Sequence, residues 1–120
     1  MKIGIIGTGW RAQGYMKVIS LFSHRMEVSA VLAHSEKSAQ EMEIYFPGKV
    51  ERNLDEFLKR DYDFVIVLVL GKNVLSYIEK LMEKGIPVLS ETPPGYGVEE
   101  LEKCWKLKEK YHGKIQVAEQ

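Results

Sequence analysis

The first twelve residues constrain the fold of this chain more than any other segment. An apolar run, Lys2 to Ile6, passes directly into the closely spaced glycines Gly7 and Gly9, and a helical pattern follows. In such a strand-turn-helix the first glycine permits a tight turn, the second leaves the backbone open to a pyrophosphate, and a small third residue lets the helix pack close to the strand. Ala12 is that small residue. The segment therefore predicts the phosphate-binding turn of a dinucleotide-binding fold.

The backbone from Thr8 to Ala12 would supply the contacts in this turn. The N–H groups of a helix's first turn have no partner within the helix, and the positive end of the helix dipole adds to their attraction for an anion. Trp10 and Arg11 lie in that first turn, and Arg11 either reaches a phosphate or lies in solvent. The alternative for the whole motif is a glycine turn kept only for packing.

Strand-like and helix-like segments alternate along the chain, which is typical of a parallel sheet covered by helices on both faces. We expect strands at Lys2–Ile6, Glu27–Ala33, Val50–Glu51, Phe64–Leu70, Pro87–Ser90 and Lys114–Ala118. We expect helices at about Trp10–His24, from Ser35 to before Pro47, after a cap at Asn53, through Val74–Met82, and at Val98–Tyr111. Right-handed crossovers then favour a single α/β domain over residues 1–120, a doubly wound, three-layer Rossmann fold with strand order 3-2-1-4-5-6.

The apolar spacing also predicts which helix faces are buried. The first helix is expected to bury Tyr15, Val18, Ile19 and Phe22, and the last helix Val98, Leu101, Cys104 and Trp105. The single cysteine, Cys104, is expected to be a small buried hydrophobe.

The charge balance limits the classes of partner. Lys plus Arg and Asp plus Glu are 17 each, so no net field attracts a nucleic acid. The longest apolar run, Phe64–Leu70, is far shorter than the roughly 20 residues that span a bilayer, so no membrane association is expected. The same lack of a long apolar segment leads us to expect a cytoplasmic protein. We also expect no metal site, since His24 and His112 have no partners at ligand spacing.

Four segments together resemble one family, the Gfo/Idh/MocA oxidoreductases, named for glucose-fructose oxidoreductase, inositol dehydrogenase and a rhizopine-catabolism protein. They are Gly7–Ala12, Asp63–Val67, Lys84–Pro93 and Ile115–Gln120. The resemblance implies a first domain that binds NAD or NADP. It also implies a second domain that covers the nicotinamide and holds a sugar or polyol, and the 120 residues lack that domain.

The resemblance places Leu70 and Glu91 beside the nicotinamide. The family's Glu-Lys-Pro motif reads Glu91-Thr92-Pro93 here, so Thr92 replaces the lysine that usually aids proton transfer. Loss of a positioned acid or base typically lowers a rate about 10²- to 10⁴-fold, which puts ordinary alcohol oxidation by this chain in doubt. For Glu91 the alternative is a carboxylate hydrogen-bonded only to its own loop.

The end of the second strand bears on the choice of dinucleotide. A site that prefers NAD carries an acid there, which accepts hydrogen bonds from the adenosine ribose and repels a 2′-phosphate. This chain has His34 and Ser35 instead, which favours NADP slightly over NAD, although Glu36 is near. His34 can also be read as an ordinary exposed residue.

Three functions are compatible with these features. The first is the cofactor-binding part of an oxidoreductase that is not catalytically complete alone. The second is a non-catalytic module that uses a dinucleotide to regulate or select a partner. The third is a structural role in which the exposed edge strand Lys114–Ala118 pairs with another copy of the chain, giving a homo-oligomer.

Overall fold

The computed structural model describes residues 1–46, 49–69, 71, 73–91, 94 and 97–118. Its strands are β1 (Lys2–Ile6), β2 (Glu27–Leu32), β3 (Val50–Glu51), β4 (Phe64–Val67), β5 (Val88–Ser90) and β6 (Ile115–Val117). Its helices are α1 (Trp10–Ser20), α2 (Glu36–Tyr45), α3 (Leu54–Leu58), α4 (Asn73–Glu83) and α5 (Val98–Tyr111). The alternation predicted from the sequence is confirmed along the described chain.

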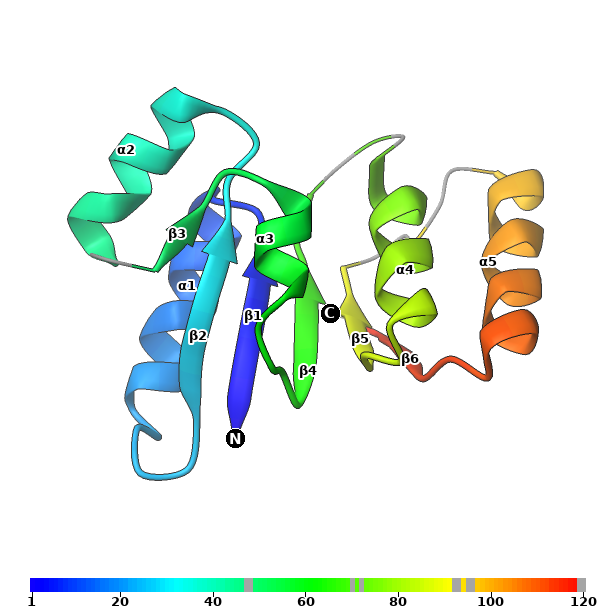
Figure 1. Cartoon of the computed structure of the whole chain (residues 1–120), viewed down its shortest axis with the longest axis horizontal. Coiled ribbons are helices and arrows are strands. Elements are labelled where there is room, and N and C mark those ends of the chain that lie inside the picture. Colours follow the sequence, from blue (N-terminus) through cyan, green and yellow to red (C-terminus); the bar gives the residue numbers. More distant parts are fainter. Residues whose placement is uncertain (47–48, 70, 72, 92–93, 95–96, 119–120) are drawn as a thin grey trace.

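The strands form one parallel sheet in the order β3-β2-β1-β4-β5-β6, as predicted (Figure 1). Parallel strands put all their carboxyl ends at one edge of the sheet, and ligands of such folds bind at that edge. β1 and β4 are neighbours at the centre of the sheet. The chain adds β2 and β3 on one side of β1, and then crosses to add β4, β5 and β6 on the other side. The glycine turn after β1 therefore lies at the switch point of the sheet.

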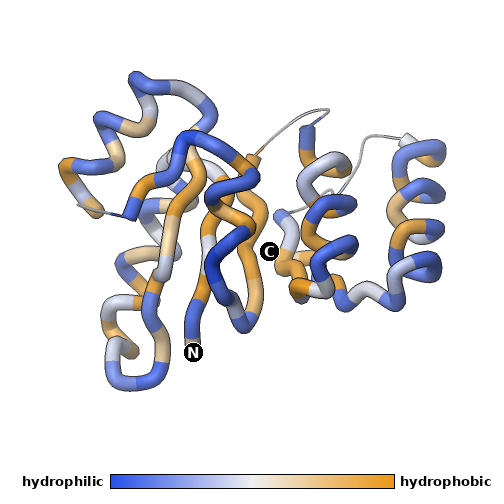
Figure 2. Tube along the Cα trace, in the orientation of Figure 1, coloured by the Kyte–Doolittle hydropathy of each residue, from blue (hydrophilic) through white to orange (hydrophobic). Residues whose placement is uncertain are grey.

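Each face of the sheet has its own apolar core. On one face α1 and α2 pack on β1 and β2 through residues such as Ala12, Ile19 and Met42. On the other face α3, α4 and α5 pack on the sheet around Phe57 and Ile78. The hydropathy of the residues agrees with this arrangement (Figure 2). The strands are mostly hydrophobic, whereas hydrophobic and hydrophilic residues alternate along the helices. β4 is buried from Val65 to Val67, as a strand covered on both faces should be.

Several helices and strands are shorter than predicted. α1 ends at Ser20 rather than at His24, because hydrogen bonds such as Phe22 N–H to the Ile19 carbonyl (2.9 Å) tighten the chain into turns. β2 ends at Leu32 instead of Ala33, and β5 begins at Val88 instead of Pro87. β4 and β6 are also shorter than expected, at Phe64–Val67 and Ile115–Val117.

The predicted inward faces of two helices were partly wrong. In α1 Ile19 is buried and Tyr15 is half-buried against the core, but Val18 is 53% exposed. Phe22 lies beyond the end of α1 and is 44% exposed. In α5 Cys104 is buried as expected, whereas Val98, Leu101 and Trp105 are exposed. The inward stripe of α5 instead runs from Cys104 through Leu107 and Tyr111, which are spaced at i, i+3 and i+7.

No helix among the described residues combines the length and the apolar character that crossing a membrane requires.

Candidate functional site at the end of β1

The turn after β1 has the geometry that the sequence predicted. Gly7 has a φ of +124°, and a Cβ there would lie 3.1 Å from the Leu68 carbonyl oxygen. Its N–H donates to the Leu32 carbonyl at 3.0 Å, which fixes the turn against β2. Only glycine adopts this conformation without strain, so Gly7 is required by the turn itself.

Gly9 differs from Gly7 in its surroundings. It has an ordinary φ of −73° as the N-cap of α1, and a Cβ there would meet no atom within 4 Å. Packing within the protein therefore does not demand glycine at this position. An open space in front of a helix start is what a pyrophosphate needs to approach the backbone.

The first turn of α1 is suited to an anion. No side chain caps this end of the helix, and no acidic residue lies in its first turn. Ala12 is completely buried and brings the helix start close to the sheet. Thr8, Trp10 and Arg11 complete the segment, and Trp10 is 77% exposed. The backbone N–H groups and the helix dipole can thus face a ligand here.

Arg11 and Glu91 form an ion pair across the carboxyl edge of the sheet. Arg11 Nε donates to Glu91 Oε2 at 2.8 Å, and Arg11 Nη2 donates to Glu91 Oε1 at 2.7 Å. The side chains are 31% and 17% exposed, and the carboxylate raises the pKa of Arg11 above its usual value, chiefly by hydrogen bonding. The pair joins the start of α1 to the residue after β5, and it spans the end of β4.

Arg11 therefore does not lie free in solvent, and the Glu91 carboxylate is not hydrogen-bonded only to its own loop. That Arg11 reaches a phosphate stays a prediction. The guanidinium contacts Glu91 and also lies over the Trp10 ring, 5.3 Å from its centroid. Leu70 and Thr92 lie outside the described residues, so the structure does not place them.

The end of β2 forms a second part of the candidate site. Ser35 caps α2, accepting from Ser38 N–H at 3.1 Å and donating to Ser38 Oγ at 3.0 Å. His34 is exposed, and its Nδ1 lies 3.5 Å from Ser38 Oγ. The Ser35 hydroxyl is therefore engaged within the protein, although the helix start that it caps remains at the carboxyl edge.

Sequence reasoning missed one cation near this end. Arg52, the residue after β3, donates to Glu36 at 2.8 Å and 3.0 Å and lies 2.6 Å from Glu43. These contacts neutralise the acid that follows Ser35. β3 is the neighbour of β2 in the predicted strand order, so the strand order places Arg52 beside the end of β2.

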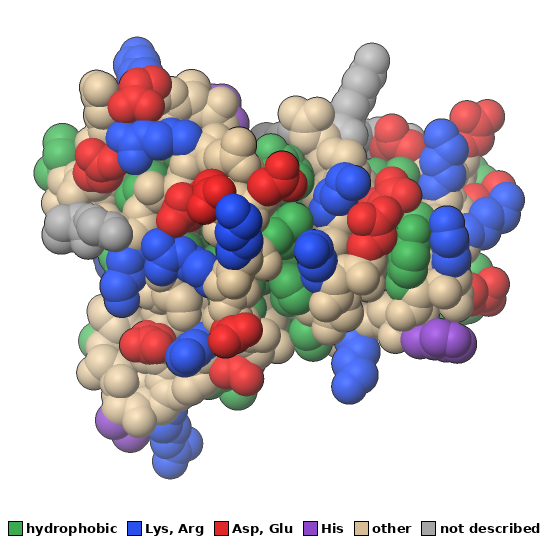
Figure 3. Space-filling view, viewed as in Figure 1, with side chains coloured by type: hydrophobic (Ala, Val, Ile, Leu, Met, Phe, Trp, Pro, Cys, Tyr) green, Lys and Arg blue, Asp and Glu red, His purple; other side chains and the backbone are tan. Residues whose placement is uncertain are grey.

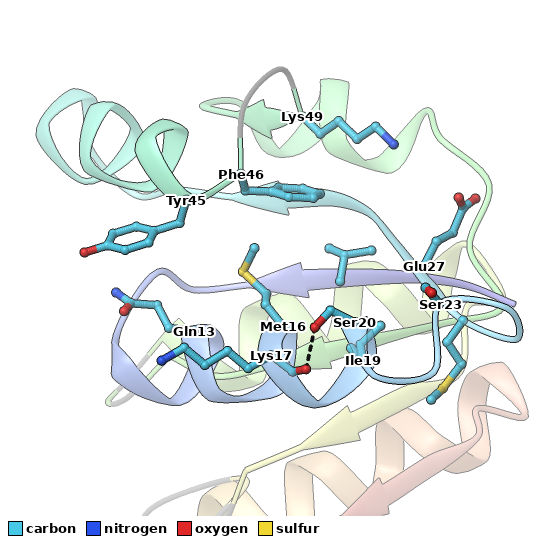
Figure 4. Close-up of a pocket in the computed structure, with 12 residues that line it drawn as sticks. Gln13, Met16, Lys17, Ile19, Ser20, Ser23, Glu27, Tyr45, Phe46 and Lys49 are labelled. Carbon is cyan, nitrogen blue, oxygen red and sulfur yellow. Dashed lines mark hydrogen bonds between the residues drawn. The ribbon is translucent and has the colours of Figure 1, made fainter.

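A hollow of about 610 Å³ lies elsewhere, between α1, the start of β2 and the end of α2 (Figure 4). Met16, Ile19 and Phe46 line it, with Lys17 at its rim. None of the predicted site residues takes part. Because it includes the first residues of β2, it is remote from the carboxyl edge, and we do not assign the dinucleotide to it. Within the described residues no three His, Cys, Asp or Glu side chains gather as a metal-binding group.

The parallel sheet, its strand order and the glycine turn define a Rossmann domain. The family model described as "Oxidoreductase family, NAD-binding Rossmann fold" matches residues 1–119. The chain therefore belongs to the Gfo/Idh/MocA family, as the resemblance indicated, and it forms that family's NAD-binding domain. No curated protein sequence matches it.

Solved structures share the fold at low sequence identity. The WlbA dehydrogenase of Chromobacterium violaceum, in complex with NADH and UDP-GlcNAcA, has a TM-score of 0.88 and 18% identity over 98% of this chain and 34% of its own. The scyllo-inositol dehydrogenase of Lactobacillus casei, with NAD(H) and scyllo-inositol, has a TM-score of 0.83 and 21% identity over 98% and 36%. The chain thus spans about a third of the length of these relatives.

Proposed function

We propose that this chain binds NAD or NADP along the carboxyl edge of its sheet and forms the cofactor-binding part of an oxidoreductase for a sugar or polyol-like substrate. The observation that carries the proposal is the uncapped start of α1, reached through the strained turn at Gly7 and left open at Gly9. The solved structures that share this fold in complex with NADH or NAD(H) support the assignment.

In this proposal the residues of the chain have distinct tasks. The amides from Thr8 to Ala12 hold the pyrophosphate, with Gly9 leaving room for it. His34 and Ser35 lie beside the adenosine ribose. Leu70 and Glu91 flank the nicotinamide, which accepts or gives a hydride when the cofactor is bound.

We propose further that the chain alone does not complete the reaction. A threonine at position 92 cannot act as a proton donor or acceptor near neutral pH, and the relatives carry about twice this chain's length in addition. The same threonine favours the second candidate, a non-catalytic module that binds a dinucleotide to regulate a partner. Oxidation of a sugar or polyol by any protein that contains this chain would exclude the purely regulatory function.

Isothermal titration calorimetry of the chain with each dinucleotide tests the proposed function. We expect saturable binding with one site and a dissociation constant below about 1 mM, which corresponds to at least about 4 kcal/mol of binding free energy. Absence of heat and of any thermal stabilisation at several millimolar NAD and NADP would refute the proposal.

The two dinucleotides should bind with unequal strength. We expect NADP to bind more tightly than NAD, because His34 and Ser35 bring no negative charge to the ribose and Glu36 is neutralised by Arg52. Titrations at equal ionic strength measure the ratio. Arg52→Met should lower that ratio by leaving the Glu36 carboxylate without its cationic partner, and a preference for NAD in the unaltered chain would contradict the expectation.

The Arg11–Glu91 pair yields a charge-specific prediction. Arg11→Met should weaken dinucleotide binding about tenfold, since it removes a cation near the phosphates and leaves the Glu91 carboxylate unpaired beside an anionic ligand. Adding Glu91→Gln to Arg11→Met should restore part of the affinity by removing that repulsion. Calorimetry at two salt concentrations measures both effects.

A matched ion pair provides the control. Arg60 pairs with Glu51 at 2.8 Å with side chains 39% and 24% exposed, close to the values for Arg11 and Glu91. The Arg60 side chain lines the surface that holds Lys2 and Glu27, the first residues of β1 and β2, and donates to the Ser29 carbonyl. The guanidinium thus lies toward the amino edge of the sheet, although its partner Glu51 ends β3. Arg60→Met should leave dinucleotide affinity unchanged. An equal loss in both variants would show that Arg11 acts only through general stability.

A further inference from the structure

The outward face of α5 carries a row of apolar side chains that the fold does not cover. Val98, Leu101 and Trp105 are 71%, 46% and 61% exposed, although they lie at i, i+3 and i+7 on one helix. A shallow hollow of about 310 Å³ lies among these three residues, with Glu102 and Lys106 also lining it. Single exposed apolar residues are common on protein surfaces, but a contiguous row rimmed by charges is typical of an interface.

The position of α5 leaves this row accessible. α5 is the last helix of its layer, with α4 beside it, and it packs inward through Cys104 (Figure 1). Acidic and basic side chains are interspersed over the α4–α5 side of the molecule (Figure 3). Glu102 and Lys106 line the same hollow as the apolar row, so charged groups border the row.

Trp105, the large aromatic residue of the row, can be buried in an interface without losing a hydrogen bond. Trp105 Nε1 donates to Glu109 Oε1 at 2.8 Å, and Lys108 Nζ lies 5.4 Å from the centroid of its ring. The polar atom of the indole therefore has a partner on its own helix. Covering the ring would leave no unsatisfied donor, which is the usual cost of burying tryptophan.

The charges along α5 select the partner. The first turn carries the acidic Glu99, and the last turn carries the basic Lys108, whose ammonium lies beside the Trp105 ring of the row. A second α5 that runs antiparallel places its basic end against the acidic end of the first, whereas a parallel one places like charges together. Two apolar rows related by a two-fold axis also match each other in length.

We infer that α5 docks onto α5 of a second copy of this chain in antiparallel orientation, burying Leu101 and Trp105 at the centre. Glu102 and Lys106 rim the row one helical turn apart, so Glu102 of each copy meets Lys106 of the other. The inference is independent of dinucleotide binding, because α5 and the start of α1 lie on different parts of the molecule.

A single helix pair gives a small interface, so the dimer should be weak, with a dissociation constant of about 100 µM. Sedimentation velocity of the whole chain from micromolar to about millimolar concentration measures the association. Trp105→Glu should abolish it. Ile44→Glu is the matched control, because Ile44 is 79% exposed on α2 and should leave the dimer intact.

Charge reversal tests the antiparallel arrangement. Glu102→Lys alone and Lys106→Glu alone should each weaken the dimer about tenfold, since each homodimer then contains two like-charge contacts. An equimolar mixture of the two variants should restore association, because every contact between the unlike copies is again between opposite charges. The loss of dimer affinity in each single variant should be smaller at high salt, because salt screens the like-charge contacts.

Several outcomes would overturn the inference. A chain that stays monomeric at millimolar concentration has no such interface. A dimer that survives Trp105→Glu uses another surface, such as the edge strand β6. A parallel arrangement would show no loss with Glu102→Lys, because its contacts are repulsive in the unaltered chain as well.

Discussion

Replacement of Gly9 by valine should reduce dinucleotide binding at least about 100-fold while the domain stays folded. The backbone at Gly9 has a φ of −73°, which valine tolerates, and a Cβ there would meet no protein atom within 4 Å. The added side chain would instead occupy the space in front of the helix start, where the pyrophosphate must approach the amides. Calorimetry measures the affinity, and a circular-dichroism melt checks the fold.

Gly14 provides the control for this prediction. It lies on the same helix, is exposed, and a Cβ there would also meet nothing within 4 Å. Gly14→Val should therefore bind dinucleotide as the unaltered chain does. Retention of affinity in Gly9→Val would show that the amides of this turn do not hold the phosphates, and it would remove the main support for the proposed function.

A substitution at Gly7 should affect the stability of the turn rather than ligand binding. Alanine at Gly7 should destabilise the fold by about 1 to 3 kcal/mol, because φ is +124° and the Leu68 carbonyl is close. Gly9→Val and Gly7→Ala are thus expected to affect different quantities, the binding free energy and the free energy of unfolding.

Features that depend on neighbours in sequence could be predicted well. The turn from Gly7 to Ala12, the cap at Asn53 and the bounds of α5 follow from local residue chemistry. The strand order also follows, since right-handed crossovers leave few arrangements for alternating strands and helices. Short-range spacing thus determines the turn, the cap and the helix bounds, whereas the succession of elements along the chain determines the strand order.

Features that depend on how elements meet could not be predicted. Val18 and Trp105 fit an apolar spacing, yet each helix is rotated on the sheet so that another stripe faces inward. The bond between Arg11 and Glu91 joins residues 80 positions apart, and only the packed sheet brings them together. Side-chain pairing across an edge is a result of tertiary geometry rather than of periodicity.

Truncation of Phe57 to alanine should have the largest effect on stability, a loss of about 3 to 5 kcal/mol. Phe57 is completely buried under β1, and its ring stacks on Tyr62 with centroids 4.8 Å apart. Gly4 permits this packing, since a Cβ there would lie 2.8 Å from Phe57 Cζ. The alanine would leave a cavity beside a rigid strand that cannot collapse into it.

Urea denaturation measures the loss for Phe57→Ala, and Phe22→Ala is the control because Phe22 is 44% exposed and should change stability by less than about 1 kcal/mol. Phe57 belongs to the core on the face opposite α1. Dinucleotide affinity well below the melting temperature should therefore stay within about twofold of the unaltered value.

Saturating dinucleotide at 100 times its dissociation constant should raise the free energy of unfolding of either protein by about 2.7 kcal/mol. A variant that lost affinity as well as stability would show that the two faces of the sheet are coupled, and that α3 supports the phosphate turn through β1.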